Sequence, residues 1–310
     1  MPLLSMVSRA ARAVCVERLA ALLILSTCGS PVIAQSDTLA QIQRTGVIRM
    51  AHRDGAVPFS YADKGGKPLG FTVELCERIA EKVRDHLKMP AIQIQWMQVA
   101  SADRMKVVKE GKVDMECGST TNNPERRKQF QFSMPFYLAG IKIMSRKELG
   151  AQSVEQLIKR RVAANTGTTA ARLMGAGGKG EQFGVQLVET KDHAEAWSLL
   201  QEGKVEAWVT DDALLAGYRA TSPNPQAYIL SDRFLTVEPY GIVMRLEDRE
   251  LVALANAEIT QLMRMGAFRS LYEKWFQKTI PGRNISLDLP MNHLMRAQVA
   301  SPSEVLPLTF

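Results

Sequence analysis

Residues 113–126 hold the side chains best suited to binding a small polar molecule. An apolar-leaning strand, 113–117, breaks at Gly118 into a run of short polar residues that includes two suitable hydroxyls. Pro124 fits the first turn of a helix, which places Arg126 inside that turn. Hydroxyls accept from an ammonium group, and a guanidinium binds a carboxylate through two parallel hydrogen bonds. The stretch suits a free amino acid, although a strand, a turn and a helix with an exposed arginine would give the same pattern.

Other polar side chains are expected in equivalent places, beyond the carboxyl ends of strands, where open α/β sheets bind ligands. Several begin helices, whose free N–H groups favour carboxylates. Taken singly, Ser101 and Asp211 would be helix caps and His193 a surface histidine. Arg53 and Arg104 would be solvated arginines. Three arginines around one cleft imply an anionic guest, because a desolvated charge needs a partner. The candidate set is Arg53, Ser101, Arg104, Ser119, Thr121, Arg126, Thr169, His193 and Asp211.

A dicarboxylic amino acid matches this set, because it carries two carboxylates and one ammonium group. Arg126 and Thr169 would bind one carboxylate. Arg53, Arg104, Ser101 and His193 would bind the other carboxylate. Asp211, Ser119 and Thr121 would bind the ammonium group.

The composition is that of a globular protein large enough for two domains. The chain has 310 residues, of which 46% are hydrophobic and 23% charged. The formal net charge of +7 comes from dispersed lysines and arginines, which argues against a nucleic-acid binder. The four histidines and four cysteines have no metal-ligand spacing, so no metal is expected. We also expect no cofactor and a monomer.

The first 34 residues are expected to be a cleaved secretory signal peptide. Arginines precede an apolar run, 19–25, and small residues follow up to Ala34. The run is too short to span a bilayer comfortably. Lipidation of Cys28 is the weaker alternative, because Thr27 stands where glycine or alanine is usual. The mature protein is therefore expected to be soluble and to lie outside the cytoplasm.

Removal of this segment would leave two cysteines, Cys76 and Cys117. An oxidising compartment permits a disulfide between them. Cys76 lies on a predicted helix and Cys117 at a predicted strand end, so they would pair if that helix packs on that strand. Two buried free thiols remain almost equally compatible with the sequence.

Strands alternate with helices along the chain, which predicts an α/β fold with mainly parallel sheets. The loops are expected at 52–61 and 175–180. The strands are expected at 47–51, 92–96, 113–117, 140–145, 161–164, 186–189, 205–209 and 240–244. The helices are expected at 37–46, 72–87, 101–110, 170–174, 192–202, from Asp211 onward, 251–265 and 268–276.

A short internal echo indicates two similar lobes. Residues 110–114 recur as 202–206, and each copy ends a helix at a glycine and opens a strand. The offset between the two copies is 202 − 110 = 92 residues. Two polar candidates of the first half have a polar residue at this offset in the second half. The pairs are Ser119 with Asp211, and Ser101 with His193.

Four stretches resemble the periplasmic glutamate/aspartate-binding proteins of ABC uptake systems, in solute-binding protein family 3. The specific motifs are Glu-Cys-Gly-Ser-Thr-Thr-Asn-Asn at 116–123 and Asp-Asp-Ala-Leu-Leu-Ala-Gly at 211–217. His-Arg followed by Val-Pro-Phe-Ser-Tyr within 52–61, and Lys-Asp-His at 191–193, support them. The resemblance covers about 38–290. It implies the same division of the candidate residues between the α-carboxylate, the side-chain carboxylate and the α-ammonium group.

The resemblance also implies the two-lobed type II periplasmic binding protein fold, which closes on its ligand by a hinge. Two crossings are expected, near 136–140 and 238–242. The first lobe would comprise 35–138 and 241–310, and the second lobe 139–240. The implied function is capture of L-glutamate or L-aspartate and its delivery to inner-membrane ABC permease subunits, without catalysis.

Three alternatives stay open. A receptor for glutamine or another polar amino acid would leave Arg53 and Arg104 under-used. An exported dehydratase or lyase on the same fold would need a general acid in the cleft, for which Glu116 is a weak candidate. A sensor whose closed form docks a signalling partner has the same sequence features as a transport receptor.

Overall fold

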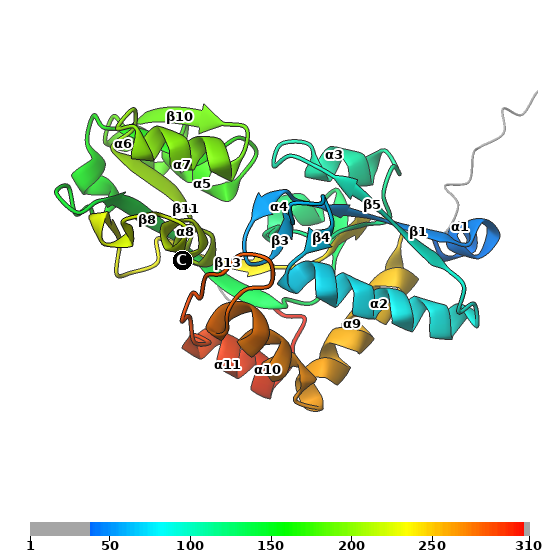
Figure 1. Ribbon diagram of the computed structural model, residues 1–310. Coiled ribbons are helices and arrows are strands. Elements are labelled where there is room, and N and C mark those ends of the chain that lie inside the picture. Colours follow the sequence, from blue (N-terminus) through cyan, green and yellow to red (C-terminus); the bar gives the residue numbers. More distant parts are fainter. Residues whose placement is uncertain (1–37, 307–310) are drawn as a thin grey trace, which may run out of the picture. The chain divides into compact units, whose positions relative to one another are not determined.

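The computed structural model describes residues 38–306. These residues belong to one compact unit, and the predicted signal peptide with Cys28 lies outside the described range. None of the helices described is both long enough and apolar enough to cross a bilayer. Two sheets with their helices form two lobes, which Figure 1 shows with β8 and β13 between them.

The first lobe is built around a five-stranded sheet. The strands β1 and β5, and β1 and β6, are parallel, whereas β14 is antiparallel to β6 and β7. In sheet order the strands are β5 (Gln93–Gln98), β1 (Val47–His52), β6 (Met115–Glu116), β14 (Val243–Arg245) and β7 (Phe130–Phe132). The helices of this lobe are α1 (Thr38–Thr45), α2 (Phe71–Leu87), α3 (Arg104–Lys109), α4 (Pro124–Arg127), α9 (Arg249–Arg264), α10 (Ala267–Tyr272) and α11 (His293–Ala300).

The second lobe is built around a six-stranded sheet. Its strands β10, β9 and β11 are parallel, and β8 is antiparallel to β11, β12 and β13. In sheet order the strands are β10 (Gln186–Thr190), β9 (Arg161–Asn165), β11 (Ala207–Asp211), β8 (Tyr137–Arg146) and β12 (Tyr228–Leu230), with β13 (Thr236–Tyr240) also on β8. The helices are α5 (Thr169–Met174), α6 (Lys179–Gln182), α7 (His193–Gln201) and α8 (Asp212–Ala220).

The prediction of mainly parallel sheets is wrong, because both sheets are mixed. In each lobe three parallel strands carry the βα alternation that the sequence pattern detects. The antiparallel strands belong to the segments that carry the chain between the sheets, where no helix intervenes. Parallel pairing needs a long crossover connection, whereas antiparallel strands do not. Strand and helix alternation alone therefore did not predict their direction.

The chain passes from the first sheet to the second along β8 and returns from β13 to β14. Tyr137 pairs with Tyr240, and Leu138 with Pro239, so the two passing segments are hydrogen-bonded neighbours. Thr121 of the first lobe forms an isolated bridge with Tyr240. The lobe boundaries at 138/139 and 240/241, and a hinge at these segments, remain predictions.

Two predicted loops contain regular structure. Residues 52–61 contribute to a three-stranded sheet of β2 (Gly55–Ala56), β3 (Ser60–Ala62) and β4 (Pro68–Leu69), and the glycine-rich run at 175–180 leads into α6. These strands are only two or three residues long. Elements this short show too few residues for a hydrophobic period to be read.

The C-terminal segment contacts the start of β8. Asn292 donates through Nδ2 to the Leu138 carbonyl (2.9 Å), and Gln298 donates through Nε2 to the Pro135 carbonyl (3.0 Å).

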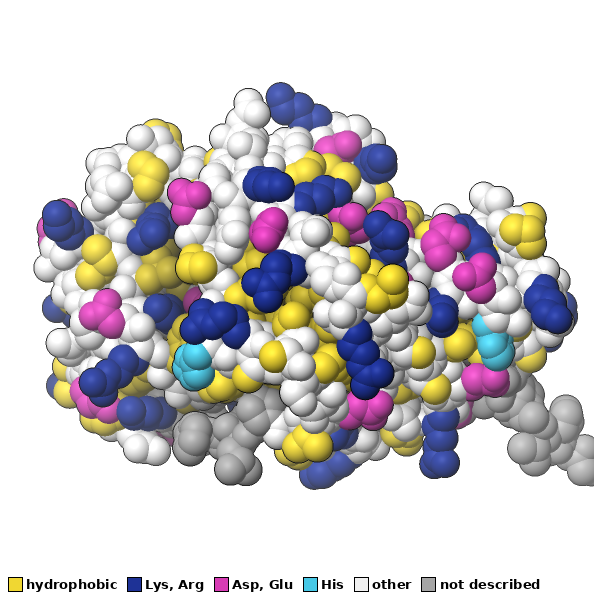
Figure 2. Space-filling model, turned by 90° about the horizontal axis from the view of Figure 1, so that it is seen from below, with side chains coloured by type: hydrophobic (Ala, Val, Ile, Leu, Met, Phe, Trp, Pro, Cys, Tyr) yellow, Lys and Arg dark blue, Asp and Glu magenta, His cyan; other side chains and the backbone are white. Residues whose placement is uncertain are grey.

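The face shown in Figure 2 carries lysines and arginines scattered among acidic side chains, with no single basic block. The dispersed charge expected from the sequence is therefore seen on this face.

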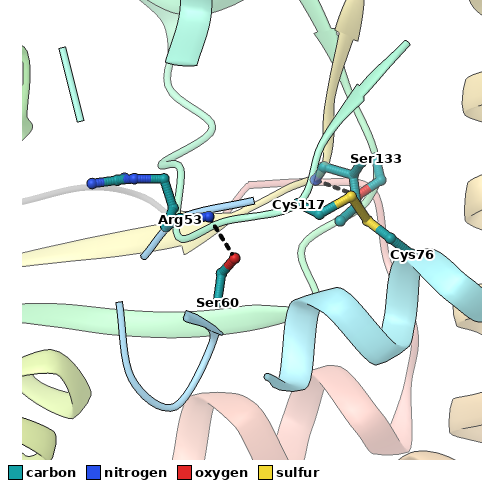
Figure 3. Close-up of a disulfide and its surroundings, with 6 residues drawn as sticks. Arg53, Ser60, Cys76, Cys117 and Ser133 are labelled. Atoms are coloured by element: carbon teal, nitrogen blue, oxygen red, sulfur yellow. Dashed lines mark hydrogen bonds between the residues drawn. A yellow bond between two sulfur atoms is a disulfide. The ribbon is translucent and has the colours of Figure 1, made fainter. Parts of the chain in front are cut away.

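Cys76 and Cys117 form a disulfide, which Figure 3 shows. It joins α2 to the residue that follows β6. Both cysteines are fully buried. Of the two possibilities left open by the sequence, the structure has the disulfide, because α2 packs on the sheet that contains β6.

The internal echo corresponds to a repeated contact at the start of the first parallel strand of each lobe. In the first lobe, the Arg49 backbone N–H donates to Asp114 Oδ2 (2.8 Å), and the Arg49 guanidinium lies 2.6 Å from Asp114 Oδ1. In the second lobe, Arg161 makes the same two contacts to Glu206, each at 2.8 Å. The lobes differ in burial, because the Asp114 side chain is fully buried and the Glu206 side chain is 28% exposed.

This repeat gives a matched comparison of two acidic residues. Asp114→Ala should lower the free energy of unfolding by about 3–5 kcal/mol, because buried Arg245 also lies 3.6 Å from Asp114 and would lose a partner. Glu206→Ala should cost less than about 1 kcal/mol, because its ion pair is solvated. Urea denaturation of both variants measures the difference, and equal losses would contradict it.

Candidate functional site

All nine residues predicted from the sequence line one narrow cavity. They come from both lobes, and the loops and helix starts that carry them follow the carboxyl ends of parallel strands. Three further residues line the same cavity and were missed: Thr168, Thr210 and Leu214. Thr168 and Thr210 directly precede the predicted Thr169 and Asp211, so a search for runs of polar residues at strand ends would have found them.

Arg53 follows β1 and is held by neutral acceptors. Its Nε donates to the Val99 carbonyl (3.2 Å), and its terminal nitrogen donates to the Ser101 hydroxyl. Its backbone N–H donates to the Ser60 hydroxyl of β3 (2.9 Å), as Figure 3 shows. The short strands that the sequence did not predict therefore fix the backbone of one candidate residue.

Ser101 is not the N-cap of the following helix, which corrects the prediction for its local role. Helix α3 begins at Arg104, with Asp103 at the N-cap position. Arg104 donates through Nε to the Thr120 hydroxyl (2.8 Å) and through Nη1 to the Ser101 carbonyl. Ser101 thus contacts both arginines, one through its hydroxyl and one through its carbonyl.

The opening stretch of the sequence folds mainly as predicted. The strand is shorter, Met115–Glu116, and Asn123 caps α4 by accepting from the Arg126 backbone N–H (2.9 Å). The cap orients the first turn so that Arg126 points back, and its Nη1 donates to the Thr121 carbonyl (2.8 Å). Proline at the first helical position is compatible with this turn because its missing N–H has no helical partner there.

One backbone carbonyl of the second lobe accepts from two arginines of the first. Gly167 lies in the turn between β9 and α5, with φ +75°, a conformation that favours glycine. Its carbonyl accepts from Arg126 Nη2 (3.1 Å) and from Arg104 Nη2 (3.4 Å). The turn therefore closes one side of the cavity.

The second lobe contributes polar groups that lack partners. Asp192 caps α7 by accepting from Glu195 N–H (2.8 Å), as predicted, which places His193 at the first helical position. Neither ring nitrogen of buried His193 has a hydrogen-bond partner among the described residues. Asp211 stands at the N-cap position of α8, but its side chain makes no cap bond, so the prediction that it caps the helix is wrong.

Burial dominates the electrostatics of the arginines. It lowers the pKa of Arg126 to about 9, with contributions from the positive charges of Arg104 and Arg172. It lowers the pKa of Arg53 to about 10, again with Arg104 contributing. Burial and then Arg53 and Arg104 hold the pKa of His193 well below its usual range, so the imidazole is neutral. Each effect would be relieved by an anion.

The pKa of Asp211 would be brought back toward its usual range by a cation and not by an anion. Burial, and then the neighbouring carboxylate of Glu238, raise the pKa of Asp211 above its usual range. Its Oδ1 has no hydrogen-bond partner within the described part of the chain. A cation placed beside Asp211 would stabilise its carboxylate, so the cavity can accept a molecule with both anionic groups and a cationic group. Within residues 38–306, no group of three or more metal-ligand side chains is found.

Two sheet-containing lobes, two hydrogen-bonded passing segments and a polar cavity at the strand ends define the type II periplasmic binding protein fold. The family model described as "Bacterial extracellular solute-binding proteins, family 3" matches residues 48–278. The chain belongs to this family, which confirms the resemblance read from the sequence.

Two curated relatives that cover most of this chain are named as binding proteins. An "L-glutamate/L-aspartate-binding protein" of Pseudomonas aeruginosa is 33% identical over 285 residues, covering 91% of this chain and 94% of that protein. A "Glutamate/aspartate import solute-binding protein" of Escherichia coli is 30% identical, covering 91% and 96%. The solved structure of a mutant of ArgBP from T. maritima has a TM-score of 0.70 at 26% identity, covering 77% of this chain and 99% of its own.

Asp212, next to Asp211, provides a pH-dependent prediction. Burial raises its pKa from 3.8 to about 6, while its Oδ1 accepts from the Gly140 N–H (3.3 Å). Because the folded state binds this proton more tightly, its stabilising contribution is complete below pH 3.8 and is lost as pH rises through about 6. Wild type should therefore lose about 3 kcal/mol more than Asp212→Asn between these limits. Denaturant unfolding of ligand-free protein across this range measures the difference, and parallel curves would contradict it.

Proposed function

We propose that this protein captures L-glutamate or L-aspartate outside the cytoplasm and delivers it to the permease of an ABC importer, without catalysis. The observation that carries the proposal is the charge pattern of the cavity. Three buried guanidiniums and one buried carboxylate, from Arg53, Arg104, Arg126 and Asp211, line the same small space. A dicarboxylic amino acid presents the complementary charges.

Each of the nine candidate residues has a proposed role. The α-carboxylate would be bound by Arg126 and Thr169, close to the α5 N-terminus. The α-ammonium would be bound by Asp211, with hydroxyls as further acceptors, and the side-chain carboxylate by the other arginines. The full sets are Arg126 and Thr169 for the α-carboxylate, then Asp211, Ser119 and Thr121 for the α-ammonium group. Arg53, Ser101, Arg104 and His193 form the set for the side-chain carboxylate. The missed Thr168, as the cap of α5, would support the first set.

The neutral state of His193 supports its role. A neutral imidazole has one N–H donor and one acceptor nitrogen. Within a cluster of arginines it adds a donor for a carboxylate without adding a further buried charge. Its two unpartnered ring nitrogens are consistent with a ligand as the partner.

We further propose that the lobes close on the ligand by a hinge at β8 and β13. The support is the pairing of these segments, together with the Gly167 carbonyl that accepts from arginines of the opposite lobe. The names of the relatives support ABC import, and the predicted signal peptide supports a periplasmic location. A monomer is the proposed form.

The alternatives have less support. Glutamine would place a neutral amide beside Arg53 and Arg104, and would leave their burial without a compensating charge. A dehydratase or lyase would need an acid or base that reaches the ligand, and Glu116 is not among the residues that line the cavity.

Calorimetry on refolded protein starting at residue 35 tests the proposal. Glutamate or aspartate should bind tightly at a 1:1 ratio, with little heat from glutamine, arginine or succinate. Succinate binding as tight as glutamate binding would remove Asp211 from its ammonium-binding role. Preference for glutamine would show that Arg53 and Arg104 do not bind a side-chain carboxylate. Absence of binding to any acidic amino acid would refute the proposed ligand class.

Two arginine variants separate the roles. Arg126→Ala should abolish binding of every amino acid, because the α-carboxylate is common to all. Arg104→Ala should weaken acidic ligands by about 1.5–3 kcal/mol and neutral ones much less, since a charge-assisted bond is lost only with the former. Titrations with glutamate and glutamine measure both losses.

The chain supplies matched controls on the same two helices. Arg127 is the exposed neighbour of Arg126, and Lys106 is an exposed residue on the helix of Arg104. Arg127→Ala and Lys106→Ala should leave both titrations unchanged. Equal losses of glutamate and glutamine in Arg104→Ala would refute the assignment of Arg104 to the side-chain carboxylate.

A further inference from the structure

Glu116 is a buried carboxylate that the proposed binding roles leave without a function. It lies on β6, paired with Ala51 of β1 and Val243 of β14, and it is fully buried. Neither of its carboxylate oxygens has a hydrogen-bond partner among the described residues. Burial of a charged group without hydrogen bonds is costly unless nearby opposite charges compensate it.

The compensating charges are the three arginines of the cavity. In Arg53, Arg104 and Arg126, burial lowers the guanidinium pKa and the negative charge of Glu116 acts in the opposite direction. The surroundings of Gly118 show that the carboxylate lies near the aliphatic stem of Arg53. A Cβ at this glycine would lie 2.2 Å from Glu116 Oε1 and 3.1 Å from Arg53 Cγ. The carboxylate therefore packs over the Gly118 backbone, beside the Arg53 side chain.

The arginines make their hydrogen bonds to neutral oxygens. Their acceptors are backbone carbonyls and hydroxyls. Glu116 thus acts on them through charge and leaves their N–H geometry to other groups. Glu116 is not among the residues that line the cavity, so its effect on a bound ligand would be exerted through the arginines.

We propose that Glu116 is a specificity-determining residue, whose fixed negative charge offsets the arginine cluster before the ligand binds and limits how strongly the cluster attracts the ligand's second carboxylate. This inference rests on the proposed binding of an acidic amino acid. With the charge of Glu116 in place, electrostatic attraction alone does not retain a small anion, so a ligand must also match the hydrogen-bond donors. Long-range charge interactions of this kind act on acidic ligands and spare neutral ones.

The test compares glutamate and glutamine in Glu116→Gln, which keeps the shape of the side chain and removes its charge. Glutamate should bind about fivefold more tightly than to wild type, while the Kd of glutamine should change by less than about twofold. An unchanged or reduced preference for glutamate over glutamine would overturn the proposal.

Glu238→Gln is the matched control. Glu238 is also a buried carboxylate with an unpartnered oxygen, but it lies beside Asp211, the proposed partner of the ammonium group. Because glutamate and glutamine carry the same ammonium group, this variant should change both affinities by the same factor. A change confined to glutamate would show that any buried carboxylate near the site has this effect, and would overturn a special role for Glu116.

A second measurement separates this inference from the proposed function. If wild type binds neither glutamate nor aspartate, the proposed function fails, and the counter-charge is tested with inorganic sulfate. Sulfate should raise the unfolding temperature of Glu116→Gln more than that of wild type, because the variant has one negative charge fewer beside the arginine cluster. Equal shifts would overturn the proposal.

A double variant covers the case in which Glu116→Gln does not fold. Removing two neighbouring buried charges of opposite sign is less costly than removing one of them. Glu116→Gln combined with Arg53→Gln should therefore fold and be more stable than Glu116→Gln alone. A double variant that is equally or less stable would overturn the counter-charge role.

Discussion

The structure depends on the burial of three guanidinium groups in one small cavity. Each is 9% exposed or less, and their hydrogen-bond acceptors are neutral oxygens of the protein. Neutral acceptors satisfy the geometry of a guanidinium without neutralising its charge. The elements around the cavity supply these acceptors at defined points: the β5–α3 connection, the turn after β6, and the Gly167 turn of the opposite lobe. The proposed preference for an anionic ligand follows from this arrangement more directly than from any single residue.

The duplicated architecture explains why the cavity is asymmetric in charge. Both lobes use the order of three parallel strands followed by an antiparallel one, and both anchor the first strand with an arginine–carboxylate contact. At the ligand ends of these strands the first lobe carries the arginines, whereas the second carries Asp211 and a neutral His193. A repeated scaffold with different residues at equivalent strand ends presents opposite charges to one molecule. The proposed ligand would then be bound by both lobes, and neither half alone would supply its complement.

Much of the site could be predicted because strand ends, glycine stops and caps are local features. Asp192 and Pro124 each specify a helix start within a few residues, so the placement of His193 and Arg126 followed from the sequence. Ser101 could not be interpreted in this way, because its hydroxyl accepts from Arg53, 48 residues away, while its local pattern is that of a cap. Asp211 has the same ambiguity. The antiparallel strands and the sheet of β2, β3 and β4 depend on tertiary pairing, which no local period encodes.

The disulfide links the assembly of the cavity to the proposed export of the chain from the cytoplasm. Cys117 precedes Gly118, and its partner Cys76 is on a helix 41 residues earlier, so this bond tethers the start of the polar turn to the body of the first lobe. Disulfides form after translocation into an oxidising compartment and not in the reducing cytoplasm. A chain still in the cytoplasm has an untethered turn and a larger conformational freedom around its arginines. For a chain exported as proposed, the turn beside the arginines is therefore tethered only after translocation.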